Sequence, residues 1–332
     1  MQILVTGANG FVGATLCRKL VERGDSVRGL VRKTSDLSLL EGIRIQRMVG
    51  SLDDRESLNR AVKGVELVYH VASAVSDWGT WDMFRRANVE GTRRVLEASS
   101  GAGVKRFVYV SSVAVHSFIG AQEMNENSPQ LPTPFPYCQT KREAEVVVLK
   151  AHQEGRIGVT VVRPGDVFGP GDRVSLLKMA GLLEAGRMAY INGGKTLGAF
   201  TYVENLADGL ILAGIQKRAL GETYVITDGT KVSWREYFER LTSALELPRP
   251  RLSVNATVAY GAASVLEFFY RLFRIGSRPP ITRYLIAHLR RDFHFSIEKA
   301  RRELGFQPKV DFDEAIQRTA EWYKDVVRGE RK

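Results

Sequence analysis

The chain has 332 residues, of which 44% are hydrophobic and 26% charged; these globular proportions exclude a fibrous or disordered protein. This length suggests about two domains. The two cysteines, Cys17 and Cys138, and the five scattered histidines show no metal-ligand spacing, so we expect neither a metal site nor a disulfide framework. No uncharged run reaches the ~18 residues of a spanning helix, and we expect a cytoplasmic or membrane-peripheral protein.

The net charge of +11 is unevenly distributed, because residues 271–302 hold nine Lys or Arg residues against two acids. A basic balance suits nucleic acid, a membrane surface or an anionic ligand. No basic motif with interleaved aromatic residues is present, so we expect no nucleic-acid partner.

Short apolar runs alternate with helical patterns along the first half of the chain. Strands are predicted at 3–5, 27–31, 67–71, 107–110 and 159–162, and helices at 11–22, 54–62, 84–99 and from residue 137. This alternation implies right-handed crossovers and a parallel sheet covered on both faces. The expected fold is a Rossmann-like, doubly wound α/β domain.

The sequence pattern changes twice after the fourth predicted strand. Residues 120–136 are rich in proline and polar residues, which predicts a loop overhanging the site. Beyond Pro164 the regular alternation fades and helices carrying aromatic residues dominate. We expect an NAD(P)-binding domain at 1–165, to which segments near 196–215 return, and a smaller, discontinuous α/β substrate domain formed mainly by 166–332.

Three glycines stand between the first strand and the first helix, at Gly7, Gly10 and Gly13. In a dinucleotide-binding turn they would make the tight bend, admit the pyrophosphate and let the helix pack on the strand. The helix N-terminus would then offer free N–H groups to the phosphates. We expect the intervening Asn9 and the following Phe11 and Val12 to lie beside the cofactor.

The second strand ends at Arg32 and Lys33, where an NAD-binding chain usually has an acid for the ribose hydroxyls. An acid would repel a 2′-phosphate, whereas a guanidinium binds one through two hydrogen bonds. The sequence therefore favours NADP(H) over NAD(H).

Tyr137 and Lys141 form a Tyr-x-x-x-Lys pair that lies on one face of a helix. A nearby ammonium stabilises a phenolate, so Lys141 is expected to lower the pKa of Tyr137 and prepare it for acid and base catalysis. Ser112 follows the 107–110 strand at the carboxyl edge of the sheet, where it could hold a substrate oxygen against Tyr137.

Together these motifs resemble the extended short-chain dehydrogenase/reductases, also described as the NAD-dependent epimerase/dehydratase superfamily. The similarity runs nearly end to end and includes the stretches 6–13, 88–92, 137–141, 163–170 and 202–208. It implies an oxidoreductase with Ser112, Tyr137 and Lys141 as catalytic triad and Asn88 in support. It also implies a homodimer, formed by the helices near 84–99 and 137–154. By the same resemblance, the cofactor-lining residues include Tyr137 and Lys141 themselves, together with Ser51, Leu52, Val71, Ala72, Ser73, Pro164 and Val167.

Two departures from the superfamily bear on cofactor and substrate. Ser51 and Leu52 stand where many members have Asp-Leu, and Gly165 and Asp166 stand where nucleotide-sugar enzymes usually carry Asn. The 163–171 and 283–305 segments resemble the 3β-hydroxysteroid and sterol dehydrogenase branch and its β-keto acid reductase relatives. We therefore expect a hydrophobic alcohol or ketone as substrate. The alternatives are a nucleotide-sugar epimerase or dehydratase that retains NAD, and a cofactor-sensing protein without catalysis.

A further helical pattern places bulky apolar residues along 258–273. Such a helix could line an apolar pocket, rest on a membrane near Arg271, Arg274 and Arg278, or pack in the core. The sequence leaves these three interpretations open.

Overall fold

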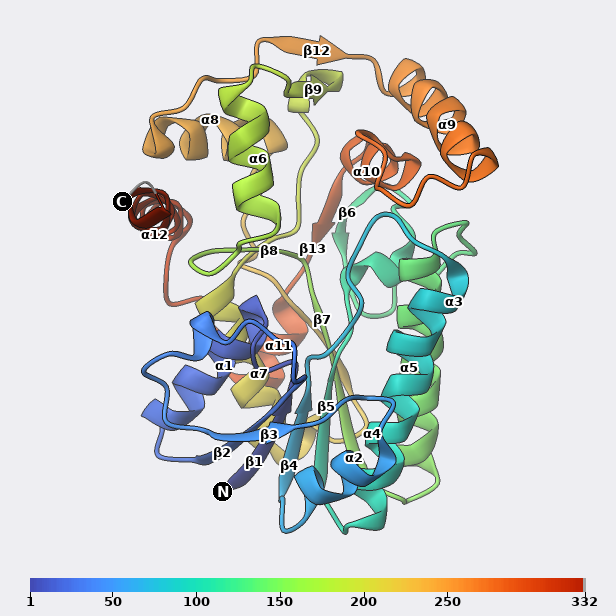
Figure 1. The fold of residues 1–332 in the computed structure, drawn as a ribbon, viewed down its shortest axis with the longest axis vertical. Helices are drawn as coiled ribbons and strands as arrows, with labels where there is room; N and C mark the ends of the chain where they lie inside the picture. Colours follow the sequence, from blue (N-terminus) through green and yellow to red (C-terminus); the bar gives the residue numbers. More distant parts are fainter. Residues whose placement is uncertain (331–332) are drawn as a thin grey trace.

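The computed structural model describes residues 1–330 and contains one large parallel sheet, with further helices and three small sheets beyond its carboxyl edge (Figure 1). The strand order is β11-β7-β5-β4-β1-β2-β3, and every neighbouring pair is parallel. The order reverses between β1 and β4, which is the switch point at which doubly wound sheets bind ligands. The expected Rossmann-like α/β fold is confirmed.

The strands of the large sheet are β1 (Gln2–Thr6), β2 (Ser26–Val31), β3 (Gln46–Val49), β4 (Leu67–His70), β5 (Arg106–Val110), β7 (Gly158–Pro164) and β11 (Thr223–Ile226). The small sheets pair β8 (Asp166–Phe168) with β10 (Phe200–Tyr202), β9 (Ala189–Ile191) with β12 (Leu252–Val254), and β6 (Ala121–Met124) with β13 (Phe293–Phe295).

The helices of residues 1–330 are α1 (Phe11–Glu22), α2 (Arg55–Val62), α3 (Trp81–Phe84), α4 (Gly91–Gly101), α5 (Pro136–Gln153), α6 (Ser175–Glu184), α7 (Val203–Ile215), α8 (Trp234–Leu245), α9 (Ala256–Leu272), α10 (Arg283–Leu289), α11 (Glu298–Leu304) and α12 (Phe312–Glu330). A π-helical segment, η2 (Arg85–Glu90), joins α3 to α4.

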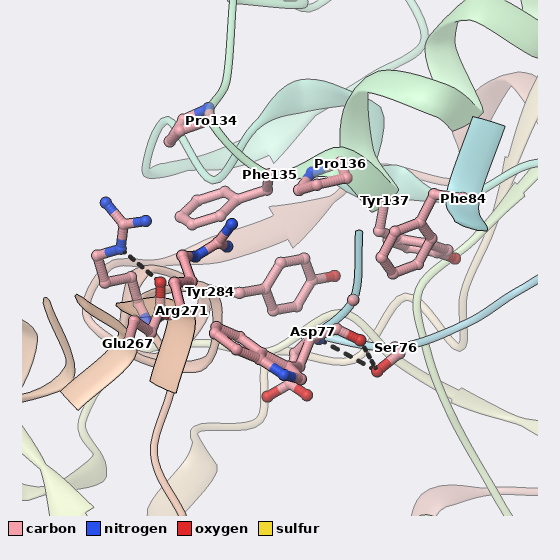
Figure 2. A pocket seen from close by; sticks show the side chains of 13 residues that line it. Ser76, Asp77, Phe84, Pro134, Phe135, Pro136, Tyr137, Glu267, Arg271 and Tyr284 are labelled. Atoms are coloured by element: carbon pink, nitrogen blue, oxygen red, sulfur yellow. Dashed lines mark hydrogen bonds and ion pairs between the residues drawn. The ribbon is translucent and has the colours of Figure 1, made fainter. Parts of the chain in front are cut away.

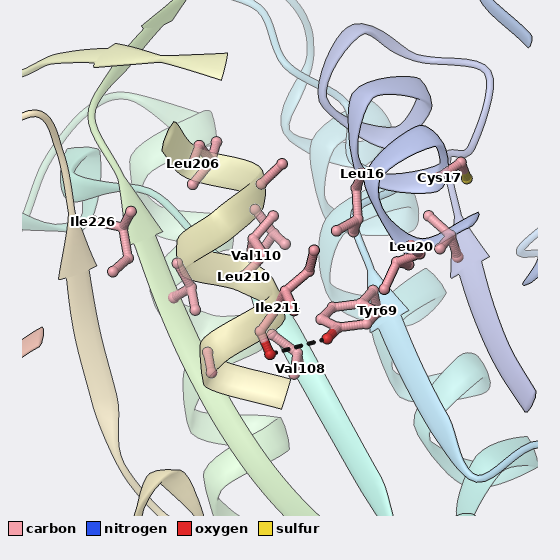
Figure 3. Close-up of a cluster of buried hydrophobic side chains, with 14 of the residues drawn as sticks. Leu16, Cys17, Leu20, Tyr69, Val108, Val110, Leu206, Leu210, Ile211 and Ile226 are labelled. Carbon is pink, nitrogen blue, oxygen red and sulfur yellow. Dashed lines mark hydrogen bonds between the residues drawn. The ribbon is translucent and has the colours of Figure 1, made fainter. Parts of the chain in front are cut away.

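Apolar helix faces cover both sides of the large sheet, which explains why its central strands are buried almost throughout. One core lies between the sheet and helices α1, α7 and α11, and the other between the sheet and α2, α4 and α5. Figure 3 shows the first of these cores, where Leu206 and Leu210 of α7 face the sheet beside Leu16 and Leu20 of α1.

The sequence pattern did not reveal two strands of the sheet. β3 lies at the edge and most of its residues are exposed, so it lacks the apolar run that marks a buried strand. β11 pairs with β7 although some 60 residues separate them, and only the tertiary fold brings them together. The predicted helix at 84–99 is instead part of a longer helical stretch that begins at Trp81 and includes the π-helical segment.

The region beyond the carboxyl edge has an aromatic core of its own. The rings of Phe168, Phe200, Tyr237 and Phe312 pack at centroid distances between 4.6 and 6.4 Å. These rings join β8 and β10 to α8 and α12, and the cluster extends to α6. Phe11 and Val12 of α1 also pack against this cluster, which attaches the region beside the glycine-rich turn.

Helix α9 turns its small residues inward and its bulky residues outward. Ala256, Ala259 and Ala263 are buried, whereas the large apolar side chains of its second half are exposed. Of the three interpretations of 258–273, packing of these bulky residues in the core is therefore wrong. No helix of residues 1–330 combines the length and apolar character needed to cross a membrane.

Candidate active site

The glycine-rich turn packs against the end of β4 more closely than any side chain would permit. A Cβ atom on Gly13 would lie 2.0 Å from the Gly7 carbonyl oxygen, and one on Gly7 would lie 2.8 Å from the Ala72 backbone. Gly7 also has φ of +69°, a left-handed conformation that glycine adopts readily. Beneath the turn, the Thr6 hydroxyl and the Nδ1 atom of His70 share a hydrogen bond of 2.7 Å, which ties β1 to β4.

The N-terminus of α1 suits a dinucleotide phosphate. Its N-cap residue is Gly10, no side chain caps the helix, and no acid lies in its first turn. The first N–H groups of α1 are thus left for a ligand, and the helix dipole favours an anion there. A Cβ on Gly10 would meet only the Gly7 carbonyl, at 3.3 Å, so the outer side of the turn is open to close approach.

The other predicted cofactor residues follow neighbouring strands along the same carboxyl edge. Arg32 and Lys33 are exposed after β2, and neither forms an ion pair within the described chain. Ser51 and Leu52 follow β3, with Leu52 packed against Gly91 at the start of α4. Near α1, the Asn9 side chain donates to the Asp36 carbonyl at 3.2 Å, and Phe11 contacts Gly171. Val12 packs against the core between the sheet and α1, α7 and α11 and also against the aromatic cluster beyond the carboxyl edge.

Asn88 fixes the segment that follows β4, which includes Val71, Ala72 and Ser73. Its Oδ1 atom accepts hydrogen bonds from the Ala74 N–H at 2.8 Å and the Ser73 hydroxyl at 3.0 Å, and its Nδ2 donates to the Ala74 carbonyl at 3.1 Å. Nδ2 also donates to the Thr140 hydroxyl of α5 at 3.2 Å. Asn88 therefore joins the cofactor-side loop to the helix that carries Tyr137, from a π-helical segment of the kind that often marks functional sites.

Tyr137 lies in the first turn of α5, and the hydroxyl of Ser112 lies near enough to its phenol to affect its pKa. Ser112 also accepts the Ala114 N–H at 3.1 Å, which fixes its position after β5. Burial raises the pKa of Tyr137 well above its usual value, while the nearby Ser112 hydroxyl opposes the rise. The expected lowering of this pKa by Lys141 is not found, because desolvation dominates.

Lys141 is 2% exposed, and its ammonium donates to the Val110 carbonyl at 2.8 Å and lies 5.2 Å from the centre of the Tyr109 ring. Burial lowers the pKa of Lys141 to about 7, and the nearby Glu145 carboxylate partly opposes this shift. The side chain thus lies one turn beyond Tyr137 at the end of β5, poised between its charged and neutral forms at neutral pH.

The neighbouring Ser111 is committed to a different network. Its hydroxyl donates to Glu145 at 2.5 Å, and Glu145 in turn forms a two-point ion pair with Arg163 at 2.9 and 2.7 Å. Both charged side chains are buried. This structural role of Ser111 leaves Ser112 as the serine that faces Tyr137.

The segment after β7 is shaped by a close backbone contact. Pro164 ends β7, and a Cβ atom on the next residue, Gly165, would lie only 1.9 Å from the Ala199 carbonyl oxygen. The carboxylate of Asp166 accepts the Ala199 N–H at 3.1 Å, and Val167 pairs with Thr201 across β8 and β10. The space that an asparagine side chain would need at Gly165 is therefore filled by backbone.

A pocket opens beside Tyr137, shown in Figure 2. Its wall includes the aromatic residues Phe84, Phe135 and Tyr284, and Pro134 and Pro136 from the end of the predicted overhanging loop. The cavity holds about 20 Å³, which is room for roughly one water molecule. A larger substrate therefore requires the surrounding segments to move apart.

Sequence reasoning missed several residues of this wall, namely Ser76, Asp77, Trp78, Glu267, Arg283 and Tyr284. They come from the loop after β4 and from α9 and α10, which are far apart in the chain. No motif joins these segments, and only the tertiary fold brings them together. Among residues 1–326, whose side chains the structure describes, no group of His, Cys, Asp or Glu is arranged to hold a metal ion.

Comparison with known proteins agrees with this geometry. The family model described as "3-beta hydroxysteroid dehydrogenase/isomerase family" matches residues 4–254. The 2-alkyl-3-oxoalkanoate reductase of Stenotrophomonas maltophilia is 32% identical, with 96% of this chain and 98% of the relative covered. The 3-beta-hydroxysteroid dehydrogenase of Mycolicibacterium neoaurum is 31% identical, with 98% and 92% covered.

Among solved structures, the dTDP-glucose 4,6-dehydratase DesIV of Streptomyces venezuelae, with NAD and TYD bound, superposes with a TM-score of 0.81 at 24% identity. The alignment covers 99% of this chain and 98% of that one, and at this identity it supports the fold alone.

The fold, the glycine-rich turn and the motif residues together define an oxidoreductase of the extended short-chain dehydrogenase/reductase class. Enzymes of this class depend on a nicotinamide dinucleotide. Within that class, the chain belongs to the 3-beta hydroxysteroid dehydrogenase/isomerase family.

Proposed function

We propose that the chain interconverts a secondary alcohol and a ketone on a hydrophobic substrate, with NADP(H) as preferred cofactor, Tyr137 as general acid and base, and Ser112 and Lys141 in support. The observation that carries this proposal is the buried Ser112 hydroxyl beside the buried phenol of Tyr137, at the wall of a largely aromatic pocket. In this proposal residues 1–165 bind the dinucleotide, with segments near 196–215, and residues 166–332 mainly form the substrate side.

The chemistry that the cofactor supplies is hydride transfer to or from the carbinol carbon. A raised pKa keeps the Tyr137 phenol protonated at neutral pH, so it is ready to protonate the carbonyl oxygen during reduction. The Ser112 hydroxyl would hold the same oxygen in place. Lys141 would contact the nicotinamide ribose, while the turn around Gly7 to Val12, the β4 end at Val71 to Ser73, and Pro164 and Val167 surround the cofactor.

The preference for NADP(H) is supported by the exposed guanidinium of Arg32 and ammonium of Lys33, which have no acidic partner among the described residues. Unpaired cations at the end of β2 suit a 2′-phosphate, and an acid at this place would suit the ribose hydroxyls of NAD. Ser51 and Leu52, at the end of β3, would contact the adenine.

Replacement of Tyr137 by Phe tests the proposal. We expect Tyr137→Phe to lower kcat for reduction of an apolar ketone by about 10²–10⁴-fold, because the proton donor is lost. Binding of NADPH, followed by the change in its fluorescence, should stay close to that of the wild type. Full activity of the variant would refute the assignment of Tyr137.

A nucleotide-sugar epimerase or dehydratase is the main alternative, and the region after β7 speaks against it. The backbone contact with Ala199 leaves no room for a side chain at Gly165, and the other residue of this stretch, Asp166, is an acid in place of the asparagine that such enzymes usually carry. A cofactor-sensing protein without catalysis is less well supported, because Ser112, Tyr137 and Lys141 are all present and buried at one edge of the sheet.

We further propose a cytoplasmic homodimer, formed by the outer faces of α4 and α5, that makes peripheral contact with anionic membranes. The membrane surface is the exposed apolar patch at the end of α9, whose members are between 40% and 66% exposed: Val265, Phe268, Phe269, Leu272, Phe273 and Ile275. Arg271 and Arg274 interrupt the patch, and both are exposed. Aromatic and aliphatic side chains alternating with cations suit an anionic bilayer, where apolar substrates also dissolve.

A further inference from the structure

A buried ion pair lies one helical turn beyond Lys141. The Glu145 carboxylate and the Arg163 guanidinium are joined at two points, at 2.9 and 2.7 Å, and their side chains are only 4% and 5% exposed. An ion pair buried this deeply contributes little net stability, because the cost of desolvation offsets most of the Coulomb attraction. Stability alone is therefore a weak reason for this pair, and its place beside Lys141 points to a role at the site.

The pair fixes the chain just after β5, where Ser112 lies. The Ser111 hydroxyl donates to Glu145 at 2.5 Å, and the Ser111 N–H donates to the Val162 carbonyl at 2.7 Å. Ser112 has extended backbone angles, with φ of −164° and ψ of 150°. Side chains of successive residues in an extended segment point to opposite sides, so anchoring Ser111 on one side directs Ser112 to the other. The Glu145 carboxylate thereby sets the direction of the Ser112 hydroxyl.

The same carboxylate acts on Lys141 through its charge. Lys141 and Glu145 are four residues apart on α5, so their side chains share one face of the helix. Burial lowers the pKa of Lys141 to about 7, and the negative charge of Glu145 opposes this shift. The other titratable groups near Lys141 are His70, Tyr109 and Tyr137. Burial lowers the pKa of this imidazole and raises the pKa of both phenols, so all three are neutral at pH 7.

Arg163 joins this pair to the loop that precedes α5. Its Nη1 atom donates to the Glu126 carbonyl at 2.9 Å and lies 3.3 Å from Nε2 of His116. Burial lowers the pKa of His116 to about 4, so its ring is neutral at pH 7 and its Nδ1 donates to the Pro129 carbonyl at 3.1 Å. Since a guanidinium keeps its proton in proteins, Glu145 stays paired with a permanent cation that is itself held by the loop.

We infer that Glu145, held by Arg163, is a positioning residue for the proposed hydride transfer. Its carboxylate directs the Ser112 hydroxyl toward Tyr137 and keeps Lys141 in its charged form. The inference rests on the proposed function, because Ser112 and Lys141 act only within it. An ammonium donates three hydrogen bonds and stabilises a neighbouring phenolate, whereas a neutral amine lacks the charge for this, so activity should follow the charge of Lys141.

Glu145→Gln tests the inference, because the amide keeps the shape and can still accept from Ser111 but has no charge. The value of kcat/KM for reduction of an apolar ketone, at saturating NADPH, is measured from about pH 5.5 to 9. We expect the pH above which activity declines to fall by about 1 in the variant, since the anion is lost and the unpaired Arg163 repels a charged Lys141. A merely structural role would lower kcat/KM by the same factor at every pH.

A second variant and a matched control accompany this test. An unpaired buried arginine can unfold a protein, so Glu145→Gln is also combined with Arg163→Met, which leaves no charge unpaired. The decline of the double variant should move in the same direction by a smaller amount, because the repulsion from Arg163 is absent. The control is Glu143→Gln, whose carboxylate accepts from Gln139 of the same helix at 3.1 Å. Glu143 is two residues from Lys141 and does not face it, so the wild-type profile should remain.

A Glu145→Gln profile of wild-type shape, at full or uniformly reduced activity, would overturn the inference. If that variant does not fold, the profile of the double variant decides by the same criterion. Absence of ketone reduction by the wild type, or full activity of Tyr137→Phe, would instead refute the proposed function.

Discussion

At the scale of single residues, Lys141 makes the stability of the folded chain depend on pH. Its lowered pKa means that the folded chain binds fewer protons than the unfolded chain between pH ~7 and ~10.5, so the free energy of unfolding should increase with pH in this window. We expect a gain of about 2 kcal/mol between pH 7 and 9 from this residue. Urea unfolding at both pH values measures it.

The control is Lys141→Met, which has no charge to bury and should lose this pH-dependent gain. If wild type and Lys141→Met show the same change between pH 7 and 9, Lys141 does not titrate with a lowered pKa. The comparison stays below pH 10. Above that pH, the raised pKa of Tyr137 makes the free energy of unfolding decrease as the pH increases.

Arg32 carries the prediction about cofactor choice. Arg32→Glu should raise the dissociation constant of NADPH by about 10- to 100-fold, because a charge-assisted hydrogen bond is replaced by repulsion, and should affect NADH much less. Arg218→Glu is the matched control, because Arg218 is exposed just before β11, at the opposite edge of the sheet. Equal weakening of both cofactors would show that Arg32 does not contact a 2′-phosphate.

Short motifs in the sequence predicted several candidate site residues, and the structure shows where these residues lie. Ser112, Tyr137 and the glycines of the first turn all come to the carboxyl edge of the sheet. The sequence did not reveal that the pKa of Tyr137 is raised, because the extent to which a phenol is buried depends on the whole fold. Nor did it reveal Arg271 as a pocket residue, since its position depends on contact between α9 and the loop after β4.

At the scale of elements, α9 differs from a core helix. Alanines form its buried face, and its bulky side chains extend into solvent beyond Val265. Arg274 follows the helix with φ of +52°, a left-handed conformation uncommon for arginine, and the Ile275 N–H bonds back to the Tyr270 carbonyl at 2.8 Å. This turn keeps Ile275 beside the aromatic end of α9, which extends the apolar surface.

Two serines in place of aromatic residues should weaken membrane contact. We expect the double variant Phe268→Ser and Phe273→Ser to bind phosphatidylglycerol vesicles at least about 10-fold more weakly in cosedimentation, since two exposed rings no longer enter the interface. Val174→Ser, another exposed apolar position but outside α9, should bind as the wild type does. If the wild type does not bind the vesicles and light scattering shows a smaller particle for the double variant than for the wild type, the patch is a protein interface and not a membrane surface.

At the scale of the whole molecule, the alternation of strands and helices was sufficient to predict a doubly wound sheet. The sequence pattern did not predict strands β3 and β11. β3 lacks an apolar run because it lies at the edge and is mostly exposed, and β11 is far along the chain from its partner β7. The layers above the sheet were predicted only as a substrate region, since their aromatic core brings together rings from β8, β10, α8 and α12.

Assembly of two chains through α4 and α5 is the prediction at this scale. Val146 is exposed on α5, so Val146→Glu should place a charge in the interface and shift the particle from dimer to monomer. Light scattering of wild type and variant at the same concentration measures the change. A wild-type monomer, or a variant that stays dimeric, would contradict this mode of assembly.

The central claim is that this chain transfers a hydride between a dissociable nicotinamide cofactor and a ketone. The most direct test uses NADPH carrying deuterium on the transferable position, an apolar β-keto substrate and mass spectrometry of the product. We predict one deuterium on the new carbinol carbon for each NADPH oxidised. Conversion of the substrate without cofactor oxidation or deuterium transfer would contradict the claim and indicate an enzyme that retains its cofactor through a closed redox cycle.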